Sequence, residues 1–240
     1  MDQIQASRSV VGTRVLGVVF GGAAALMLSA SLVAAQSPAA SPPNGMAVAA
    51  PGSEPMGVAY GEWAGRWWKN LFALPAATNP AVVDNCDANL VGDVLMLPQT
   101  TFGNALATTC HITEGQSILA SPGGTFCDDV DGTTPTEVAM LRCVDLGRNS
   151  LSGARLTIDG VDVPDVAAYW TLSPLMELTY PEGNIFGLPA TDAKGVGGGW
   201  FLVISGLESG THEIVVHDDL TDAGEHLPAD VTATVEVAAK

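Results

Sequence analysis

The chain has 240 residues, of which 26 are acidic and 9 are basic, so its formal net charge at pH 7 is −17. This charge disfavours nucleic acids and anionic lipid surfaces as partners, because both are negatively charged and would repel the protein. The length allows one sizeable hydrophobic core and is marginal for two domains.

The first 35 residues have the three parts of a secretory signal peptide. Arg8 and Arg14 supply positive charge, Val15–Leu32 contains no charged residue, and the short residues Val33–Ala35 suit cleavage by a signal peptidase. An uncleaved membrane anchor is the alternative, since Val15–Ala35 just reaches the length that spans a bilayer. We favour cleavage because glycines and alanines make this run weakly hydrophobic. The sequence therefore predicts a secreted or extracytoplasmic protein, in the periplasm or at the cell surface, with no membrane span after cleavage.

Residues 36–57 are rich in Pro, Ala, Ser and Gly, a composition that predicts a disordered leader. No later run of the chain is long and apolar enough to span a membrane. We expect the remaining residues, 58–240, to form a single domain.

This domain is predicted to begin with a tryptophan-rich amphipathic helix that ends at Pro75. Its apolar residues recur at helical spacing, and they are Tyr60, Trp63, Ala64, Trp67, Trp68, Leu71 and Phe72. Two roles are open: the rings could form an aromatic platform for a sugar or lipid, or the helix could cover a sheet. We favour the second role because the apolar face is continuous and only its edges carry charge.

A second, shorter helix is predicted from Thr134 onwards. Thr134 can cap the helix, Pro135 suits the first helical position, and Glu137 stands where a capping box needs an acidic residue. Gly147 is the expected end of the helix.

Most of the remaining chain is predicted to form short strands, because it is rich in β-branched and aromatic residues between turn signals. The predicted strands cover residues 91–97, 107–112, 154–158, 170–172, 177–180, 200–205, 212–217 and 231–237. Many short strands and only two helices indicate a mainly β fold, an antiparallel β-sandwich of the jelly-roll or immunoglobulin-like type. A parallel α/β fold would need a helix between successive strands.

The four cysteines predict two disulfide bonds, because their number is even and the chain is predicted to be exported. Three pairings are possible. We favour Cys86–Cys110 and Cys127–Cys143, since each closes a local loop. A zinc site is the alternative, but the chain has no C-x-x-C motif and His111 is the only histidine near a cysteine.

Two acidic segments are candidates for a metal site. Residues 128–132 resemble the start of a calcium-binding loop, although the following residues depart from the EF-hand spacing. Residues 217–226 combine carboxylates with two histidines, a set that suits calcium or zinc. The candidate ligands are Asp129, Asp131, His217, Asp219, Asp222 and His226. Acidic loops are commonly only solvated turns, so we expect no cofactor as the default.

The sequence nominates no catalytic residue. No serine lies in a G-x-S-x-G motif. The glycine run Gly195–Gly199 has neither the lysine nor the helix of a phosphate loop, and we expect it to let the backbone bend into Trp200. His212 follows a predicted hairpin turn and is expected to order that turn by hydrogen bonding. Whether the chain is an enzyme stays open, and a non-enzymatic role is favoured.

Several segments resemble one group of uncharacterised exported bacterial proteins. The resemblance rests on Gly61–Trp68 and on Gly210–His212, together with the order of the cysteines and the turn at Ile158–Gly160, and it covers most of residues 58–237. The chain departs from the group at Ser117–Pro122, which is shorter and less aromatic. The resemblance implies a fold and an extracytoplasmic location, and it implies no reaction and no catalytic residue.

The leading hypothesis is therefore a non-enzymatic exported protein with a binding or structural role, whose partner is a glycan or another component of the cell envelope. The alternative is a secreted metal-dependent hydrolase that uses the region His217–His226. The two hypotheses differ in whether His217, Asp219 and His226 converge in a cleft.

Overall fold

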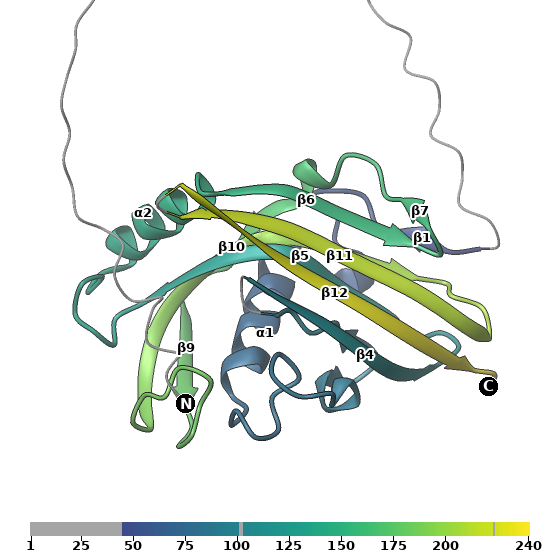
Figure 1. Ribbon diagram of the computed structural model, residues 1–240, viewed down its shortest axis with the longest axis horizontal. Coiled ribbons are helices and arrows are strands. Elements are labelled where there is room, and N and C mark those ends of the chain that lie inside the picture. Colours follow the sequence, from purple (N-terminus) through teal and green to yellow (C-terminus); the bar gives the residue numbers. More distant parts are fainter. Residues whose placement is uncertain (1–44, 101–102, 223) are drawn as a thin grey trace, which may run out of the picture. The chain divides into compact units, whose positions relative to one another are not determined.

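The computed structural model describes residues 45–100, 103–222 and 224–240. The expected signal peptide, residues 1–35, lies outside these ranges. The described residues form a mainly β unit in which two sheets pack face to face and two α-helices accompany them (Figure 1). A sandwich-like fold is therefore confirmed.

The larger sheet has seven strands, and β10 (Thr191–Ser205) and β5 (Ser117–Asp128) lie at its centre. The main path of the sheet runs in the order β1 (Ala47–Val48), β10, β5, β3 (Val94–Met96) and β2 (Leu90–Val91). Two further strands also pair with β10, and they are β8 (Trp170–Leu172) and β9 (Met176–Tyr180). The length of β10 allows it to pair with several short strands along one side.

The smaller sheet has five strands and follows the order β4 (Asn104–Thr113), β12 (Glu225–Ala238), β11 (Gly210–Asp222), β6 (Leu151–Ile158) and β7 (Val161–Asp162). Strand β12 runs parallel to β4, and in the larger sheet β3 runs parallel to β5, whereas the other pairs are antiparallel. Both sheets are therefore mixed, and the expectation of a purely antiparallel sandwich is wrong in this respect. Local alternation of side chains reports a strand's buried face but not the direction of its partner.

The space between the sheets is filled by alternate residues of their strands, as expected for half-buried strands. On β11 and β12 the buried apolar residues are Ile214, Val216, Ala229, Val231, Ala233, Val235 and Val237. The larger sheet contributes a longer apolar run on β10, which is buried on both faces because a helix covers its other side.

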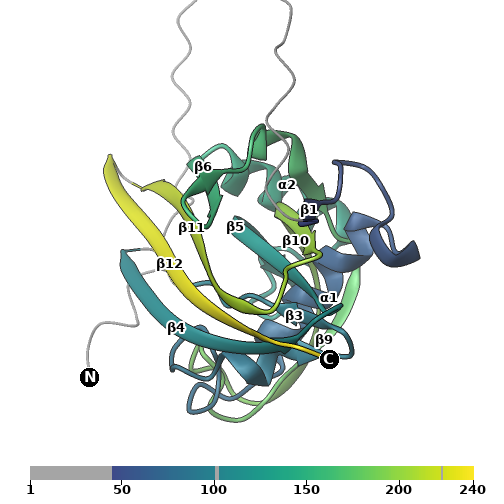
Figure 2. The same ribbon diagram turned by 90° about the vertical axis from the view of Figure 1, so that its right-hand side faces the viewer.

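Helix α1 (Tyr60–Phe72) is the predicted tryptophan-rich helix, and its three indole rings are buried. Trp67 donates a hydrogen bond from Nε1 to the carbonyl oxygen of Leu97 at 3.2 Å. Figure 2 shows α1 on one side of β5 and β10, with β4, β12 and β11 on the other side. The helix therefore covers the larger sheet, and its rings do not form an open aromatic platform.

The glycine run at 195–199 belongs to β10, and the register shift between β10 and β5 follows directly after it, between Trp200 and Leu202, where the bend was predicted. These glycines let the helices approach the sheet. A Cβ atom at Gly197 would lie 2.2 Å from Nε1 of Trp68, and one at Gly198 would lie 2.8 Å from a methyl group of Val144. The absence of side chains makes room for an indole on one face and for the second helix on the other.

Helix α2 (Glu137–Arg148) begins two residues later than predicted. Thr136 is its N-cap, because its hydroxyl accepts a hydrogen bond from the backbone N–H of Ala139 at 3.2 Å. Thr134 instead donates its hydroxyl to the carbonyl oxygen of Asp128. The sequence therefore identified the helix but placed its cap two residues too early.

Two disulfides are present, with the pairing favoured from the sequence. Cys127–Cys143 joins β5 to α2, and Cys86–Cys110 joins the 3-10 turn η3 (Cys86–Asn89) to β4. Disulfides of this kind persist in oxidising compartments outside the cytoplasm.

The end of the expected leader has a described structure. Strand β1 pairs with the last residues of β10, and a 3-10 turn, η2, spans Pro55–Gly57. The Tyr60 hydroxyl donates a hydrogen bond to the carbonyl oxygen of Ala49 at 2.9 Å. Residues 45–57 therefore pack on the domain, which begins before residue 58.

Candidate functional site

The candidate site surrounds a bulge in β6. His217 on β11 faces Arg155 on β6, whereas Asp219 faces Ser152, so one residue of β11 stands opposite two residues of β6. Gly153 lies in this bulge with a φ of 69°. Such a bulge requires a residue with left-handed backbone angles, which glycine adopts without strain. The bulge also changes the direction in which the neighbouring side chains point.

A groove of about 620 Å³ opens beside the bulge, and we call it the β6 groove. Residues 152–155 of β6 form one wall, residues around the turn η4 (Val166–Tyr169) form the opposite wall, and Trp200 of β10 completes the lining. Loop and edge residues on a rigid sheet are common places for binding sites. The groove therefore unites residues of both sheets.

Trp200, which is 7% exposed, lines the β6 groove and contacts Trp170, which lies outside the lining. The Trp170 and Trp200 rings meet edge to face with their centroids 5.0 Å apart. The guanidinium of Arg148 lies 4.7 Å from the centroid of Trp170, in cation–π distance. These contacts hold the two rings in one orientation.

The rim of the β6 groove carries a charged pair. Nε of Arg155 donates a hydrogen bond to Oδ1 of Asp162 at 2.6 Å, and the two side chains are 63% and 61% exposed. An exposed pair of this kind adds little stability. It does offer a ligand both N–H donors and carboxylate acceptors at the mouth of the groove.

His217 lies on the outer face of the smaller sheet between two carboxylates. Its Nδ1 lies 2.7 Å from Oδ1 of Asp230, and its Nε2 lies 3.3 Å from Oδ2 of Asp219. Partial burial lowers the pKa of His217, but the hydrogen bond and charge of Asp230 and the charge of Asp219 outweigh burial and raise that pKa above its usual value. Both ring nitrogens are therefore engaged.

Asp218, the next residue, points the opposite way, into the space between the sheets. Its side chain is fully buried, and within the described residues neither carboxyl oxygen has a hydrogen-bond partner. Burial raises the pKa of Asp218 to about 8; the charge of His217 opposes this rise, and the charges of Asp219 and Asp230 add to it. At neutral pH this carboxyl group is mainly protonated.

The other predicted ligands of the 217–226 segment lie at the tip of the β11–β12 hairpin. This segment was predicted to be a loop, but most of it is paired strand. Asp222 faces Glu225, and His226 faces Thr221. Thr221 is four residues beyond His217 on the same strand, a separation of about 13 Å at the usual rise of a strand. His217 and Asp219 are brought together, but His226 is too distant to share one metal ion with them.

The predicted ligands Asp129 and Asp131 serve the local backbone. Oδ1 of Asp129 accepts the N–H of Lys194 at 2.8 Å, and Oδ1 of Asp131 accepts the N–H of Thr133 at 2.8 Å. Over residues 45–100, 103–222 and 224–240, no group of three or more His, Cys, Asp or Glu side chains is placed to hold a metal ion.

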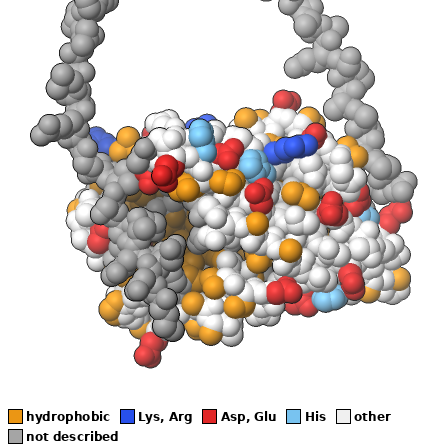
Figure 3. Space-filling view, in the orientation of Figure 1, with side chains coloured by type: hydrophobic (Ala, Val, Ile, Leu, Met, Phe, Trp, Pro, Cys, Tyr) orange, Lys and Arg blue, Asp and Glu red, His pale blue; other side chains and the backbone are white. Residues whose placement is uncertain are grey.

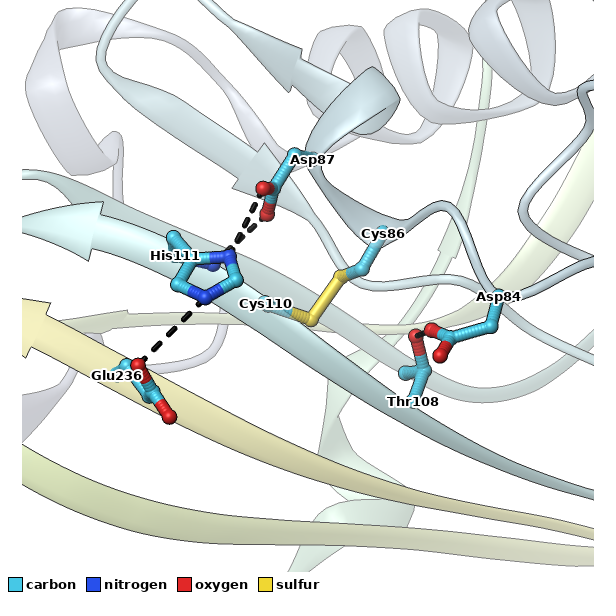
Figure 4. A network of polar contacts seen from close by, with 7 residues as sticks. All are labelled: Asp84, Cys86, Asp87, Thr108, Cys110, His111 and Glu236. Atoms are coloured by element: carbon cyan, nitrogen blue, oxygen red, sulfur yellow. Dashed lines mark hydrogen bonds and ion pairs between the residues drawn. A yellow bond between two sulfur atoms is a disulfide. The ribbon is translucent and has the colours of Figure 1, made fainter.

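His111 has a partner arrangement similar to that of His217 (Figure 4). Its Nδ1 lies 2.9 Å from Asp87 and its Nε2 lies 3.5 Å from Glu236. Asp87 also accepts the backbone N–H of His111, and the neighbouring Asp84 accepts the hydroxyl of Thr108 at 2.6 Å. These bonds and the disulfide next to them fasten η3 along the edge strand β4, which is a structural role.

His212 orders a turn. Its Nδ1 lies 2.8 Å from Oδ2 of Asp159, and its Nε2 lies 3.0 Å from the carbonyl oxygen of Glu208. Asp159, which has a φ of 51°, also accepts the backbone N–H of Glu213. The ring therefore ties the β11 start to the β6–β7 turn.

The face on which β11 and β12 lie in front carries acidic side chains, histidines and a few basic side chains in an interspersed pattern (Figure 3). Hydrophobic side chains are scattered among them on the same view. On this face of the described residues the basic side chains form no continuous patch.

Comparisons of the chain with protein-family models, with curated proteins and with solved structures give no match. In the part of the chain that the structure describes, no helix is long and apolar enough to cross a membrane. The residues around the β6 bulge are therefore the basis on which a function can be proposed.

Proposed function

We propose that this protein is exported and binds a neutral oligosaccharide in the β6 groove. The observation that carries the proposal is that one groove combines Trp200, whose ring contacts Trp170, with the exposed Arg155–Asp162 pair at its rim. Ligand sites typically combine aromatic surface with a few polar groups that set orientation. A sugar presents apolar C–H faces to an indole ring and hydroxyl groups that both donate and accept hydrogen bonds.

The charge of the protein favours a neutral ligand over an acidic one. A net charge of −17 repels anionic glycans at low ionic strength. The two disulfides and the signal peptide predicted at residues 1–35 support a location in the periplasm, at the cell surface or outside the cell. The resemblance to exported bacterial proteins supports the same location and makes the cell envelope the expected source of the glycan.

Isothermal titration calorimetry with three neutral tetrasaccharides, chitotetraose, cellotetraose and maltotetraose, tests the proposal. We expect at least one of them to bind and to shift the indole N–H resonance of Trp200 in NMR spectra. The double variant Arg155→Ala/Asp162→Ala changes only exposed rim side chains and should weaken binding at least tenfold, which corresponds to about 1.4 kcal/mol.

The matched control is Glu177→Ala, which removes an exposed charge on β9 outside the β6 groove and should leave the affinity unchanged. Tetragalacturonic acid serves as the acidic comparison. Failure of all three neutral sugars to bind, or binding of the acidic sugar alone, would contradict the proposal.

A further inference from the structure

Asp218 has no role in the proposed sugar site, yet it is the most unusual polar group among the described residues. It lies on the inner face of β11, in phase with the buried Ile214 and Val216, and its side chain is fully buried. Neither of its oxygens has a hydrogen-bond partner within the described residues. A carboxylate in such a place would lose its hydration without compensation, so the neutral acid is the form that fits the closed sandwich.

The larger sheet leaves no room for a hydrated carboxylate. Asp218 packs directly on Gly123 of β5, where a Cβ atom would lie 1.9 Å from Oδ2 of Asp218. The two sheets therefore touch at this point through a backbone and a carboxyl group. Hydration of an ionised Asp218 requires the sheets to separate here.

Both sheets have an interrupted ladder beside this contact. In the smaller sheet, the register between β11 and β6 shifts between His217 and Asp219. In the larger sheet, the register between β10 and β5 shifts between Trp200 and Leu202, where Ser121 and Pro122 of β5 form the extra length. Strand pairs with fewer regular hydrogen bonds open at lower cost than continuous ones.

The charges around Asp218 do not neutralise it. His217 and Asp219 flank it on β11, Asp230 lies on β12, and Arg155 lies on β6. His217 is already paired with the two other carboxylates, and Arg155 is paired with Asp162. The parts of β5 and β10 that face Asp218, residues 117–127 and 195–205, contain no charged residue.

We infer that Asp218 is a proton-dependent latch between the two sheets: the sandwich closes over the protonated carboxyl group, and opening at the β6 bulge releases its proton. The pKa of Asp218 is raised to about 8 by burial in the closed state, whereas an exposed aspartate has a pKa of about 3.9. Between these values the closed state holds one proton more than the open state. Closure is therefore favoured in acid, and the opening equilibrium rises about tenfold per pH unit until it levels off near pH 8.

Hydrogen exchange of the full chain tests the latch. Exchange rates of the amides at 215–220 and 151–156, corrected for the intrinsic effect of pH, should rise about tenfold per pH unit between roughly pH 5 and pH 6. The neighbouring His217 stays protonated over this range and does not contribute, because the pKa of His217 is raised above its usual value. In Asp218→Asn the corrected rates should not change with pH.

Asp219→Asn is the matched control, because it removes the neighbouring carboxylate on the outer face and should keep the tenfold slope. A second measurement does not need a variant: the carboxyl ¹³C resonance of Asp218 in the unaltered protein should titrate near pH 8. A flat exchange profile in the unaltered protein, the same slope in Asp218→Asn, or a carboxyl resonance that titrates near pH 4 would overturn the inference.

Discussion

Asp218 and Gly123 are distant in the sequence but pack directly against each other in the fold. The carboxyl group fits against β5 only because residue 123 has no side chain. Nothing in the sequence near either residue indicates this contact, since it exists only after the two sheets have packed. Alternation along β11 did offer a signal, because Asp218 follows Ile214 and Val216 at intervals of two. The predicted strand ended at residue 217 because the acidic residues that follow resemble a turn.

A substitution at Gly123 measures how tightly the sheets meet. Gly123→Ala should lower the free energy of unfolding by about 1–3 kcal/mol, the usual cost of overpacking, because the new methyl group overlaps the carboxyl group of Asp218. Urea denaturation at one fixed pH is the measurement.

The double variant Gly123→Ala/Asp218→Ala is the control for this prediction. In the Asp218→Ala background the carboxyl group is gone and only the contact with the Cβ atom of residue 218, at 2.9 Å, remains, so the added cost of Gly123→Ala should become clearly smaller. An equal cost in both backgrounds would mean that the carboxyl group of Asp218 is not what the methyl group clashes with.

Tryptophans show the same contrast between what sequence can and cannot predict. The three rings of α1 recur at helical spacing, and their burial was expected for that reason. Trp200 and its partner Trp170 come from different strands, and their contact depends on the pairing of β8 with β10. The sequence could therefore predict the burial of the helix rings but not the contact between Trp170 and Trp200.

At the scale of elements, the helices were predictable, whereas β5 was not and only residues 200–205 of β10 were. Strand β5 contains a Ser121–Pro122–Gly123–Gly124 segment, and β10 contains the run Gly195–Gly199. Proline and glycine usually mark turns, so local reasoning places breaks in both strands. Both segments are nevertheless strands. The glycines leave space against the sheet for Trp68 and α2, and Pro122 lies at the register shift between β5 and β10.

The cap of α2 gives a prediction for one element. Thr136→Ala should lower the free energy of unfolding by about 1 kcal/mol, because the N–H of Ala139 loses the hydroxyl that accepts its hydrogen bond. Thermal or urea unfolding measures the change. Thr136→Ser, which keeps a capping hydroxyl, should stay close to the unaltered protein, and an equal loss in both variants would exclude capping as the cause.

At the scale of the whole molecule, the pattern of short strands predicted the two-sheet class, the even number of cysteines predicted two disulfides, and the positions of the cysteines favoured the observed pairing. It could not predict which strands are neighbours, because β4 pairs with β12 across more than half of the chain. The candidate site was missed for the same reason: the β6 groove takes residues from β6, from the segment around η4 and from β10. Sites assembled from three separate segments leave no local motif.

The net charge of −17 predicts a response of the whole protein to salt. Raising NaCl from about 0.01 M to about 0.15 M shortens the Debye length from about 30 Å to about 8 Å, so repulsion between the many carboxylates falls. The thermal unfolding midpoint should rise accordingly, as measured by calorimetry at pH 7. The charge-reduced variant Glu177→Gln/Glu182→Gln/Glu225→Gln alters three exposed residues and should respond less steeply. A midpoint that falls or stays constant would contradict this prediction.

Strand β12 follows every other strand along the chain, yet it lies inside its sheet, between β4 and β11. A growing polypeptide that has not yet reached residue 225 leaves those two strands without the neighbour that joins them. The smaller sheet therefore cannot be completed before β12 has been synthesised, although the strands on both sides of it are made earlier.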